Sequence, residues 1–177
     1  MSPKTLLIRP CQNADLVEVT AIYTHHFAHG SGSFEIEPPS LADMTQRHAN
    51  VVQLGLPWLV ASRDNDVLGF AYASQFRPRP GFHYLVEDSV YIHPAHTGQG
   101  LGVALLAELI RHCEQVGKRQ MLAVIGDSAN VASIALHAGL GFKHAGVLQA
   151  SGWKHGRWLD VVMMQKALGA GQACDPM

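Results

Sequence analysis

The sequence predicts a single domain of mixed α/β (α+β) class, with a central sheet of six to seven strands and about four helices. The chain has 177 residues, a length that suits one domain. Apolar residues make up 47% of the chain and charged residues 15%, which is a globular balance. Strand and helix patterns do not alternate strictly, so a fully parallel doubly wound sheet is not expected. We expect the domain to span residues 1–168 and residues 169–177 to form a disordered tail.

The N-terminal part of the chain predicts one strand and two helices. The apolar run at residues 5–10 is typical of a strand. Asp15 precedes the helical run 16–27 and is expected to be its N-cap. Ser40 is the expected N-cap of a second helix over residues 41–53.

The middle of the chain predicts three strands. Apolar runs at residues 58–62 and 67–76 flank an Asp-Asn-Asp turn at 64–66, a pattern that indicates a hairpin. Residues 77–84 contain two prolines and read as a loop. The run LVEDSVYI at residues 85–92 predicts the third strand.

The C-terminal part predicts two further helices and three further strands. In the first of these helices, apolar residues recur at helical spacing and define one buried face; they are Leu101, Leu105, Leu109 and Cys113. The expected elements are a helix over 100–116, a strand over 121–125, a helix from 129 to the glycines at 139 and 141, and strands over 145–150 and 158–165.

Composition excludes several classes of function. The formal net charge of −1 argues against nucleic acid or an anionic membrane as the main partner. No apolar run reaches the ~18 residues that a membrane helix needs. Three cysteines without a CxxC pair and no signal peptide favour a reduced, cytoplasmic location. The eleven histidines are scattered and form no HExxH motif, so no metal is expected.

The segment HTGQGLG at residues 96–102 stands between an expected strand and an expected helix. It is not a phosphate loop, because no Gly-Lys-Ser/Thr follows, and the dinucleotide pattern GxGxxG fails at Val103. Gly98, Gly100 and Gly102 leave bare the first N–H groups of the helix, where the helix dipole is positive. A diphosphate fits such a cradle. A flexible, tightly packed strand–helix turn is the alternative interpretation.

This turn resembles the signature Arg/Gln-x-x-Gly-x-Gly/Ala of the GCN5-related N-acetyltransferases (GNAT), with Thr97 where that superfamily has Arg or Gln. The stretches VEDSVYIHPAH, AVIG, LHAGLGF and GWKHGRWLD are similar to a narrower group, the phosphinothricin and methionine sulfoximine N-acetyltransferases. The resemblance covers most of the chain and implies a single GNAT-type domain.

The resemblance implies that acetyl-CoA is the co-substrate. The pantetheine arm is expected to pair with the backbone of residues 90–92, and the amides of residues 98–103 are expected to bind the diphosphate. Asn130 matches a family asparagine that contacts the cofactor. The implied cofactor-binding residues are Val90, Tyr91, Ile92, Gly98, Gln99, Gly100, Leu101, Gly102, Val103 and Asn130.

N-acetylation needs a base, because an amine is mostly protonated at neutral pH. Glu87 is the candidate, since the subgroup has a glutamate there; a strand-end carboxylate satisfied by an arginine is the alternative. Strand alternation places Glu87 and Asp88 on opposite faces, and a bulge would make Asp88 the base instead. The resemblance also implies the Val90 N–H as donor to the oxyanion. His137 stands where many members carry a tyrosine that protonates the leaving thiolate. Two alternatives are that it helps to deprotonate the amine and that it is an ordinary helix histidine packed on a neighbour.

Arg77 and Arg79 flank Pro78 in the loop before this strand. Two arginines two residues apart point the same way in an extended chain, so both can face one anion such as a substrate carboxylate. A solvated pair of loop charges is the alternative. Phe34 and Phe82 are the candidate walls of the substrate pocket, and plain packing is the alternative for each.

The C-terminal motif GWKHGRWLD reads as part of a hairpin. The resembled subgroup is generally dimeric, so a homodimer is expected, in which this hairpin approaches the partner's site. Ordinary hairpin structure explains the motif equally well. The residues concerned are Lys154, His155, Arg157, Trp158 and Asp160.

Together these features predict an N-acetyltransferase that moves acetyl from acetyl-CoA to the α-amine of a small amino-acid analogue, namely phosphinothricin, methionine sulfoximine or methionine sulfone. Three alternatives stay open at this point. The acceptor is another amine, such as a peptide or protein N-terminus or a polyamine; or the protein is a non-catalytic acyl-CoA sensor; or it is a nucleotide-binding regulator.

Overall fold

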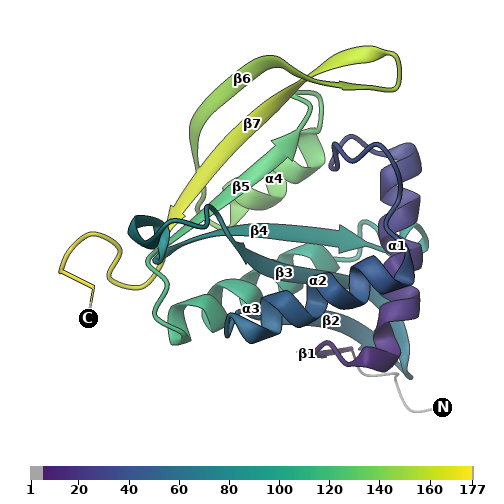
Figure 1. Ribbon diagram of the computed structural model, residues 1–177, viewed down its shortest axis with the longest axis horizontal. Coiled ribbons are helices and arrows are strands. Elements are labelled where there is room, and N and C mark those ends of the chain that lie inside the picture. The colour runs from purple at the N-terminus through teal and green to yellow at the C-terminus, as the bar shows by residue number, and fades with distance from the viewer. Residues whose placement is uncertain (1–5, 177) are drawn as a thin grey trace.

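The computed structural model describes residues 6–176 and contains a seven-stranded sheet in the order β1-β2-β3-β4-β5-β7-β6 (Figure 1). The strands are β1 (Leu7–Pro10), β2 (Trp58–Arg63), β3 (Asp66–Gln75), β4 (Leu85–Ile92), β5 (Gln120–Gly126), β6 (Lys143–Lys154) and β7 (Arg157–Ala167). The α-helices of the described residues are α1 (Leu16–His29), α2 (Leu41–Gln53), α3 (Leu101–Gln115) and α4 (Val131–Gly139). The predicted mixed α/β class, with its strand and helix numbers, is confirmed.

One pair of neighbouring strands differs from all the others. β4 and β5 run parallel, whereas each other neighbouring pair in the sheet is antiparallel. α3 makes the connection between these parallel strands, as a crossover requires. The sheet is therefore mixed and not doubly wound.

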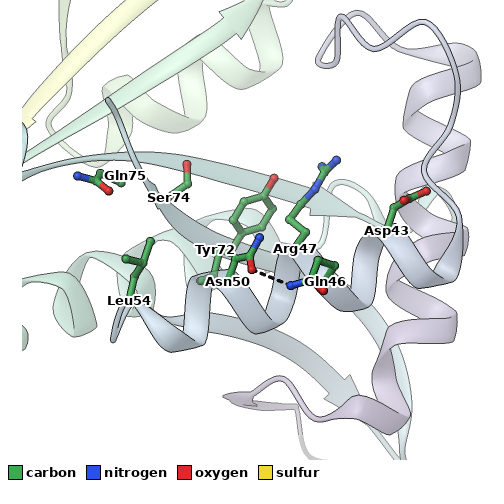
Figure 2. Close-up of a pocket in the computed structure, with 9 residues that line it drawn as sticks. Asp43, Gln46, Arg47, Asn50, Leu54, Tyr72, Ser74 and Gln75 are labelled. Atoms are coloured by element: carbon green, nitrogen blue, oxygen red, sulfur yellow. Dashed lines mark hydrogen bonds between the residues drawn. The ribbon is translucent and has the colours of Figure 1, made fainter. Parts of the chain in front are cut away.

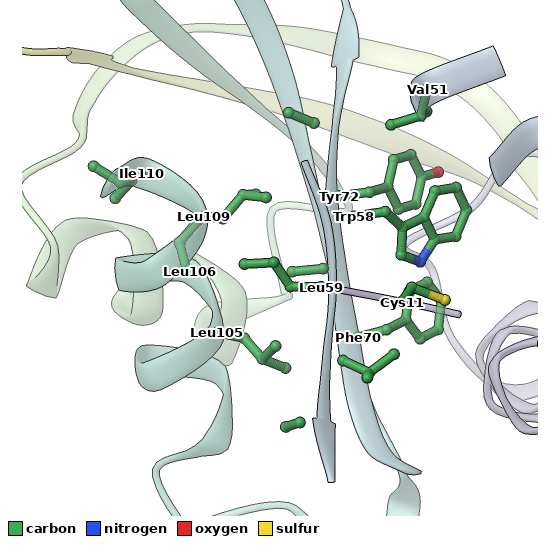
Figure 3. Packing of buried hydrophobic residues seen from close by; sticks show 14 of the residues in the cluster. Cys11, Val51, Trp58, Leu59, Phe70, Tyr72, Leu105, Leu106, Leu109 and Ile110 are labelled. Atoms are coloured by element: carbon green, nitrogen blue, oxygen red, sulfur yellow. The ribbon is translucent and has the colours of Figure 1, made fainter. Parts of the chain in front are cut away.

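The core has two halves, one on each face of the sheet (Figure 3). On one face, α1 and α2 cover a row of aromatic side chains, in which the rings of Trp58 and Tyr72 stack with centroids 4.1 Å apart. On the other face, α3 contributes Leu105, Leu106 and Leu109, all fully buried. The two halves together hold the paired strands β3 and β4 between layers of helix.

The two predicted helix caps have different outcomes. Ser40 caps α2 as predicted, since its hydroxyl accepts from the Asp43 N–H at 3.2 Å. Asp15 stands before α1, but its side chain does not cap that helix. Its carboxylate instead accepts two hydrogen bonds of 2.7 Å from Arg9 and one from the Gln12 N–H. The prediction for Asp15 is wrong because a nearby guanidinium offers a stronger, charged partner than a helix amide.

The last two strands are longer than predicted. β6 reaches Lys154, beyond the expected end at residue 150, and pairs with β7 through two shifts in register. One shift falls between Leu148 and Gly152, where Ala150 has a φ of 47°. The predicted end of the strand at residue 150 coincides with this irregularity, beyond which the pairing resumes at Gly152.

The two ends of the chain bear on the predicted domain limits. The predicted first strand begins at residue 5, which lies outside the described residues. At the other end, the Gly169 N–H donates to Glu114 at 2.9 Å, and Arg119 donates to the carbonyl of Asp175 at 3.3 Å. The limit at residue 168 stays a prediction. Within the described chain, no helix is long and apolar enough to cross a membrane.

Candidate active site

The two parallel strands pair over only part of their length. β4 is matched with β5 from Leu85 to Asp88, and the last matched pair is Asp88 with Ala123. β4 continues to Ile92 and β5 to Gly126, but no ladder joins these parts in the described chain. Figure 1 shows the strands diverging from this point. Backbone groups on the open edge of β4 are therefore available to a ligand.

A cavity of about 1280 Å³ occupies the opening between β4 and β5. Its walls come from α1, the loop before α2, β4, the turn before α3, β5 and α4. A smaller pocket of about 550 Å³ lies between α2 and β3, and Arg47 and Tyr72 line both spaces (Figure 2). No set of three His, Cys, Asp or Glu side chains in residues 6–176 is arranged to hold a metal ion.

The glycines of the turn before α3 are required for two different reasons. Gly98 and Gly100 have φ of 73° and 78°, in the left-handed region, and a Cβ at either would meet open space. Glycine is favoured there because of its backbone conformation. Gly102 is different, since a Cβ there would lie 3.3 Å from the Leu136 side chain of α4. The turn therefore keeps the start of α3 bare and lets α4 pack closely against it.

Most of the predicted cofactor residues line the large cavity. Those that do are Val90, Tyr91, Ile92, Gly98, Gly100, Leu101, Gly102, Val103 and Asn130. Gln99 is exposed and is not among the lining residues. Asn130 also has a structural task, because its side-chain oxygen accepts from the Ser133 N–H at 3.3 Å and caps α4. Thr97 lines the cavity too, and its hydroxyl donates to the Pro94 carbonyl.

Glu87 lies on β4 at the point where the strands begin to separate. It is matched with Ser74 on β3 and with Leu122 on β5. Burial raises the pKa of its carboxyl, the Asp88 charge raises it further, and the Arg77 charge lowers it. The side chain lines the cavity and has no hydrogen-bond partner within the described residues. A half-buried carboxylate without a partner is suited to accept a proton.

Asp88 and His137 form a buried pair on the opposite face of β4. The His137 Nε2 lies 2.9 Å from the Asp88 Oδ2, and the side chains are 5% and 2% exposed. The His137 Nδ1 lies 2.7 Å from the Ser133 carbonyl, so it donates there. Burial opposes the charge on His137, but the hydrogen bond and charge of Asp88 prevail and raise its pKa. The ladder between β3 and β4 is continuous, without the bulge that would exchange the two carboxylates.

Of the four predicted substrate residues, the structure places only Phe34 in the lining of the cavity. Phe34 lines the cavity, and its ring packs against Gly152 in β6, where a Cβ would overlap it. Phe82 instead packs edge-on against Phe76, with ring centroids 5.4 Å apart, and does not line the cavity. Arg77 and Arg79 are exposed and also lie outside the lining.

The sequence interpretation did not single out Tyr23 on α1 and Arg47 on α2, which line the cavity. Arg47 donates to Glu35 at 2.6 Å, and its guanidinium lies 5.2 Å from the centroid of the Tyr23 ring. Arg47 follows the buried Met44 by three positions and precedes the buried Val51 by four. An arginine at helical spacing within an apolar stripe is the signal that would have revealed it.

The C-terminal hairpin closes over the loop between α1 and α2. Lys154 donates to the Ser33 carbonyl at 2.6 Å, and the His155 Nε2 lies 3.1 Å from the Gly30 carbonyl. Arg157 is paired with Asp127 at 2.5 Å. Asp160 accepts from Ser128 and from the Ala150 N–H, and Trp158 is 61% exposed. These hairpin contacts lie within one chain.

The split between β4 and β5, with the glycine turn opening the crossover helix, is the arrangement that the resemblance to N-acetyltransferases led us to expect. The chain belongs to the acetyltransferase (GNAT) family, whose family model matches residues 16–142.

Three named acetyltransferases are similar to this chain over nearly its whole length. A phosphinothricin N-acetyltransferase of Alcaligenes faecalis is 49% identical over 96% of this chain and 86% of its own length. An L-methionine sulfoximine/L-methionine sulfone acetyltransferase of Salmonella typhimurium is 38% identical over 96% of this chain and 99% of its own. The crystal structure of a phosphinothricin acetyltransferase from Sinorhizobium meliloti in complex with acetyl-CoA superimposes with a TM-score of 0.94, at 45% identity, over 98% of this chain and 94% of the other.

Proposed function

We propose that this protein transfers acetyl from acetyl-CoA to the α-amine of a small amino-acid analogue, such as phosphinothricin, methionine sulfoximine or methionine sulfone. One observation carries the proposal: a single cavity joins the glycine turn before α3 to the Glu87 carboxylate through the split between β4 and β5. The relatives of similar length that act on these compounds support the choice of acceptor.

The glycine turn and the open edge of β4 are the proposed cofactor site. The first N–H groups of α3 have no partner within the helix and carry its partial positive charge. They bind the diphosphate, and bare Gly98 and Gly100 let it approach. The backbone of Val90, Tyr91 and Ile92 pairs with the pantetheine arm. The remaining proposed contacts with the cofactor come from Gln99, Leu101, Gly102, Val103 and Asn130.

Transfer takes place in a ternary complex. Glu87 accepts a proton from the acceptor's ammonium group, and the nitrogen then forms a bond to the thioester carbonyl carbon. The Val90 N–H stabilises the oxyanion of the tetrahedral intermediate. As that intermediate collapses, the carbon–sulfur bond breaks and the nitrogen releases its second proton to solvent. The sulfur leaves as a thiolate that takes up a proton.

His137 is the proposed source of the proton for the thiolate. Its Nδ1 hydrogen is committed to the Ser133 carbonyl, so the proton at Nε2 is the one to be given, and the hydrogen bond from Nε2 to Asp88 breaks as the proton moves to the sulfur. After the transfer, a neutral imidazole still donates from Nδ1. Asp88 acts through His137, which it keeps charged and oriented, and is therefore a positioning residue.

The remaining substrate contacts are proposed from the sequence pattern. Phe34 forms a wall of the acceptor site, which its place in the cavity lining supports. The loop with Arg77, Arg79 and Phe82 approaches the acceptor from outside the cavity. Its positive charge favours anionic amino acids over polyamines, because like charges repel.

We also propose that the protein is a cytoplasmic homodimer in which the β6–β7 hairpin faces the second copy. Trp153 and Trp158 are 63% and 61% exposed on this hairpin, and their rings lie 5.3 Å apart. A pair of exposed indoles is typical of an interface. The three cysteines are all free, which suits a reducing compartment.

A thiol-release assay with acetyl-CoA tests the proposed function. The panel holds phosphinothricin, methionine sulfoximine, methionine sulfone, a short peptide and a polyamine. We expect turnover with the amino-acid analogues and none with the polyamine. Turnover with the polyamine or the peptide alone overturns the proposed acceptor, and acetyl-CoA binding without turnover on any amine favours the sensor.

A further inference from the structure

We propose that Asp160 of β7 is a positioning residue for the reaction, because its carboxylate and its backbone hold the turn between β5 and α4 in place. This turn leads into the helix that carries Asn130 and His137, the proposed cofactor contact and the proposed acid. The inference rests on the proposed function, and it concerns how the chain places one wall of the cavity.

Asp160 lies on β7, the strand between β5 and β6, and it bonds to segments on both sides (Figure 1). Its Oδ2 accepts from the Ser128 hydroxyl at 2.6 Å, and its carbonyl accepts from the Asp127 N–H at 2.8 Å. Both of these donors belong to the turn after β5. Its Oδ1 accepts from the N–H of Ala150, in the irregular part of β6, at 3.0 Å. This one residue therefore fastens the turn to the β6–β7 hairpin.

The turn has a backbone conformation that needs such support. Asp127 has a φ of 74°, in the left-handed region that residues with a side chain seldom adopt. Its N–H donates to Asp160, its Oδ1 accepts from the Ala129 N–H at 3.0 Å, and its Oδ2 accepts from Arg157. An uncommon backbone conformation persists where the surrounding structure fixes it. Asp160 and Arg157, both on β7, therefore fix the shape of the turn.

The position of α4 follows from this turn. The Asn130 N–H donates to the Asp127 carbonyl at 3.0 Å, and the Asn130 side chain accepts from the Ser133 N–H. The Ser133 carbonyl in turn accepts from the His137 Nδ1 at 2.7 Å. Hydrogen bonds therefore lead without a break from Asp160 through the turn to both residues that α4 places in the cavity lining.

Apolar packing alone holds α4 only loosely. Among the nine residues of α4, His137 is the only buried one. Val131 in the first turn is 71% exposed, and Ile134 and Leu136 pack on the core while only partly buried. Because tertiary packing of an apolar face supplies most of the stability of a helix in a protein, a helix with so little of it depends more on polar contacts at its ends. Loss of the Asp160 contacts is therefore expected to let α4 shift.

The test is the affinity for acetyl-CoA, measured by calorimetry on the folded protein without an acceptor. We expect Asp160→Ala to raise Kd by about 3- to 10-fold and Ser128→Ala by about threefold, because each loses a hydrogen bond that holds the turn. Asp160→Asn is expected to recover part of the affinity, since its amide donates to the Ser128 hydroxyl and its oxygen still accepts from the Ala150 N–H. The double variant Asp160→Ala/Ser128→Ala is expected to bind as Asp160→Ala does, because both changes remove one contact.

Ser151→Ala is the matched control, and it is expected to keep the wild-type Kd. The Ser151 hydroxyl lies in the same irregular part of β6 but donates to the Leu148 carbonyl and not to the turn. A merely structural role for Asp160 would lower the thermal midpoint of Asp160→Ala and Ser128→Ala and leave Kd unchanged, and this result overturns the inference. So does an equal rise of Kd in Ser128→Ala and Ser151→Ala. Because no acceptor is needed, failure of the proposed acceptor leaves the test intact, whereas a wild-type protein that binds no acetyl-CoA refutes both the proposed function and the inference.

Discussion

The two faces of β4 carry neighbouring carboxylates with opposite properties. Asp88 points towards α4, is 2% exposed and is bonded to His137. Glu87 lies on the face of the sheet that Tyr72 and Ser74 of β3 share, and it has no hydrogen-bond partner within the described residues, although both carboxylates line the cavity. The two surroundings differ because side chains alternate along a strand, so adjacent residues point to opposite faces of the sheet. Whether a carboxylate in a strand is paired or free to accept a proton therefore depends on what covers its face of the sheet and not on its position in the sequence.

Replacement of Glu87 by Gln tests the open face and carries the largest expected effect. The amide has nearly the same shape but cannot accept the proton, so kcat falls by about 10²- to 10⁴-fold. The measurement is single-turnover transfer followed by thiol release. Binding of acetyl-CoA, measured by calorimetry, is expected to stay within about twofold of wild type, because no cofactor contact is removed.

Glu37→Gln is the matched control for that variant, since Glu37 is exposed in the loop before α2. It is expected to leave turnover at the wild-type level. A Glu87→Gln enzyme that is as active as this control would remove Glu87 from the reaction and leave the open face without a base.

Replacement of Asp88 by Asn tests the covered face, and here the larger effect is on stability. Below pH 6.5, where His137 is charged, removing its buried partner leaves that charge uncompensated and costs about 3–5 kcal/mol of unfolding free energy. Chemical denaturation with urea measures it. A loss below about 1 kcal/mol is what an exposed pair would give, and it would contradict the buried assignment.

The same pair predicts how stability depends on pH. The folded-state pKa of His137 is raised above its ordinary value of 6.5, so the stabilisation is fully present below pH 6.5. It is lost as the pH rises through the folded-state pKa. We expect the unfolding midpoint of wild type to fall over this range. In Asp88→Asn the fall is absent or reversed, because burial alone lowers the pKa of a histidine.

Much of this arrangement could be predicted from the sequence because it is local. The alternation in LVEDSVYI separated Glu87 from Asp88 correctly, and the glycine spacing located the turn before α3. What could not be predicted depends on tertiary contacts. Nothing near Asp88 in sequence reveals that a helix 49 residues later would supply His137. Arg47 was overlooked for the same reason, since its place in the cavity lining depends on elements that are distant in sequence.

Replacement of Gly100 by Ala asks how much the glycine turn depends on its backbone. The φ of 78° costs a side-chain-bearing residue about 1–2 kcal/mol. We expect this strain to be relieved by a shift of the turn, which raises KM for acetyl-CoA by roughly tenfold, the factor that 1.4 kcal/mol represents. Steady-state kinetics with acetyl-CoA as the varied substrate measures it.

Gly117 provides a matched control at the other end of α3. It has a φ of 79° and open space around its Cβ position, as Gly100 does, but it does not line the cavity. Gly117→Ala is expected to lose similar stability without a change in KM for acetyl-CoA. Equal KM values for the two variants would show that the turn before α3 acts only as a connection.

Replacement of Arg77 by Gln has the smallest expected effect and acts on the open face alone. The Arg77 charge lowers the pKa of Glu87. Its removal therefore raises that pKa, and the acidic limb of kcat/KM moves to higher pH because the base is protonated over a wider range. Because Arg77 is exposed, salt screens the effect, and the shift is expected to shrink between low and high ionic strength.

Arg79→Gln is the control variant, since Arg79 is not among the charges that shift the pKa of Glu87. The acidic limb of its kcat/KM profile is expected to stay at the wild-type pH. If the acidic limb of kcat/KM moves equally in both variants, the loop of Arg77 and Arg79 acts through the charge of the substrate and not through Glu87.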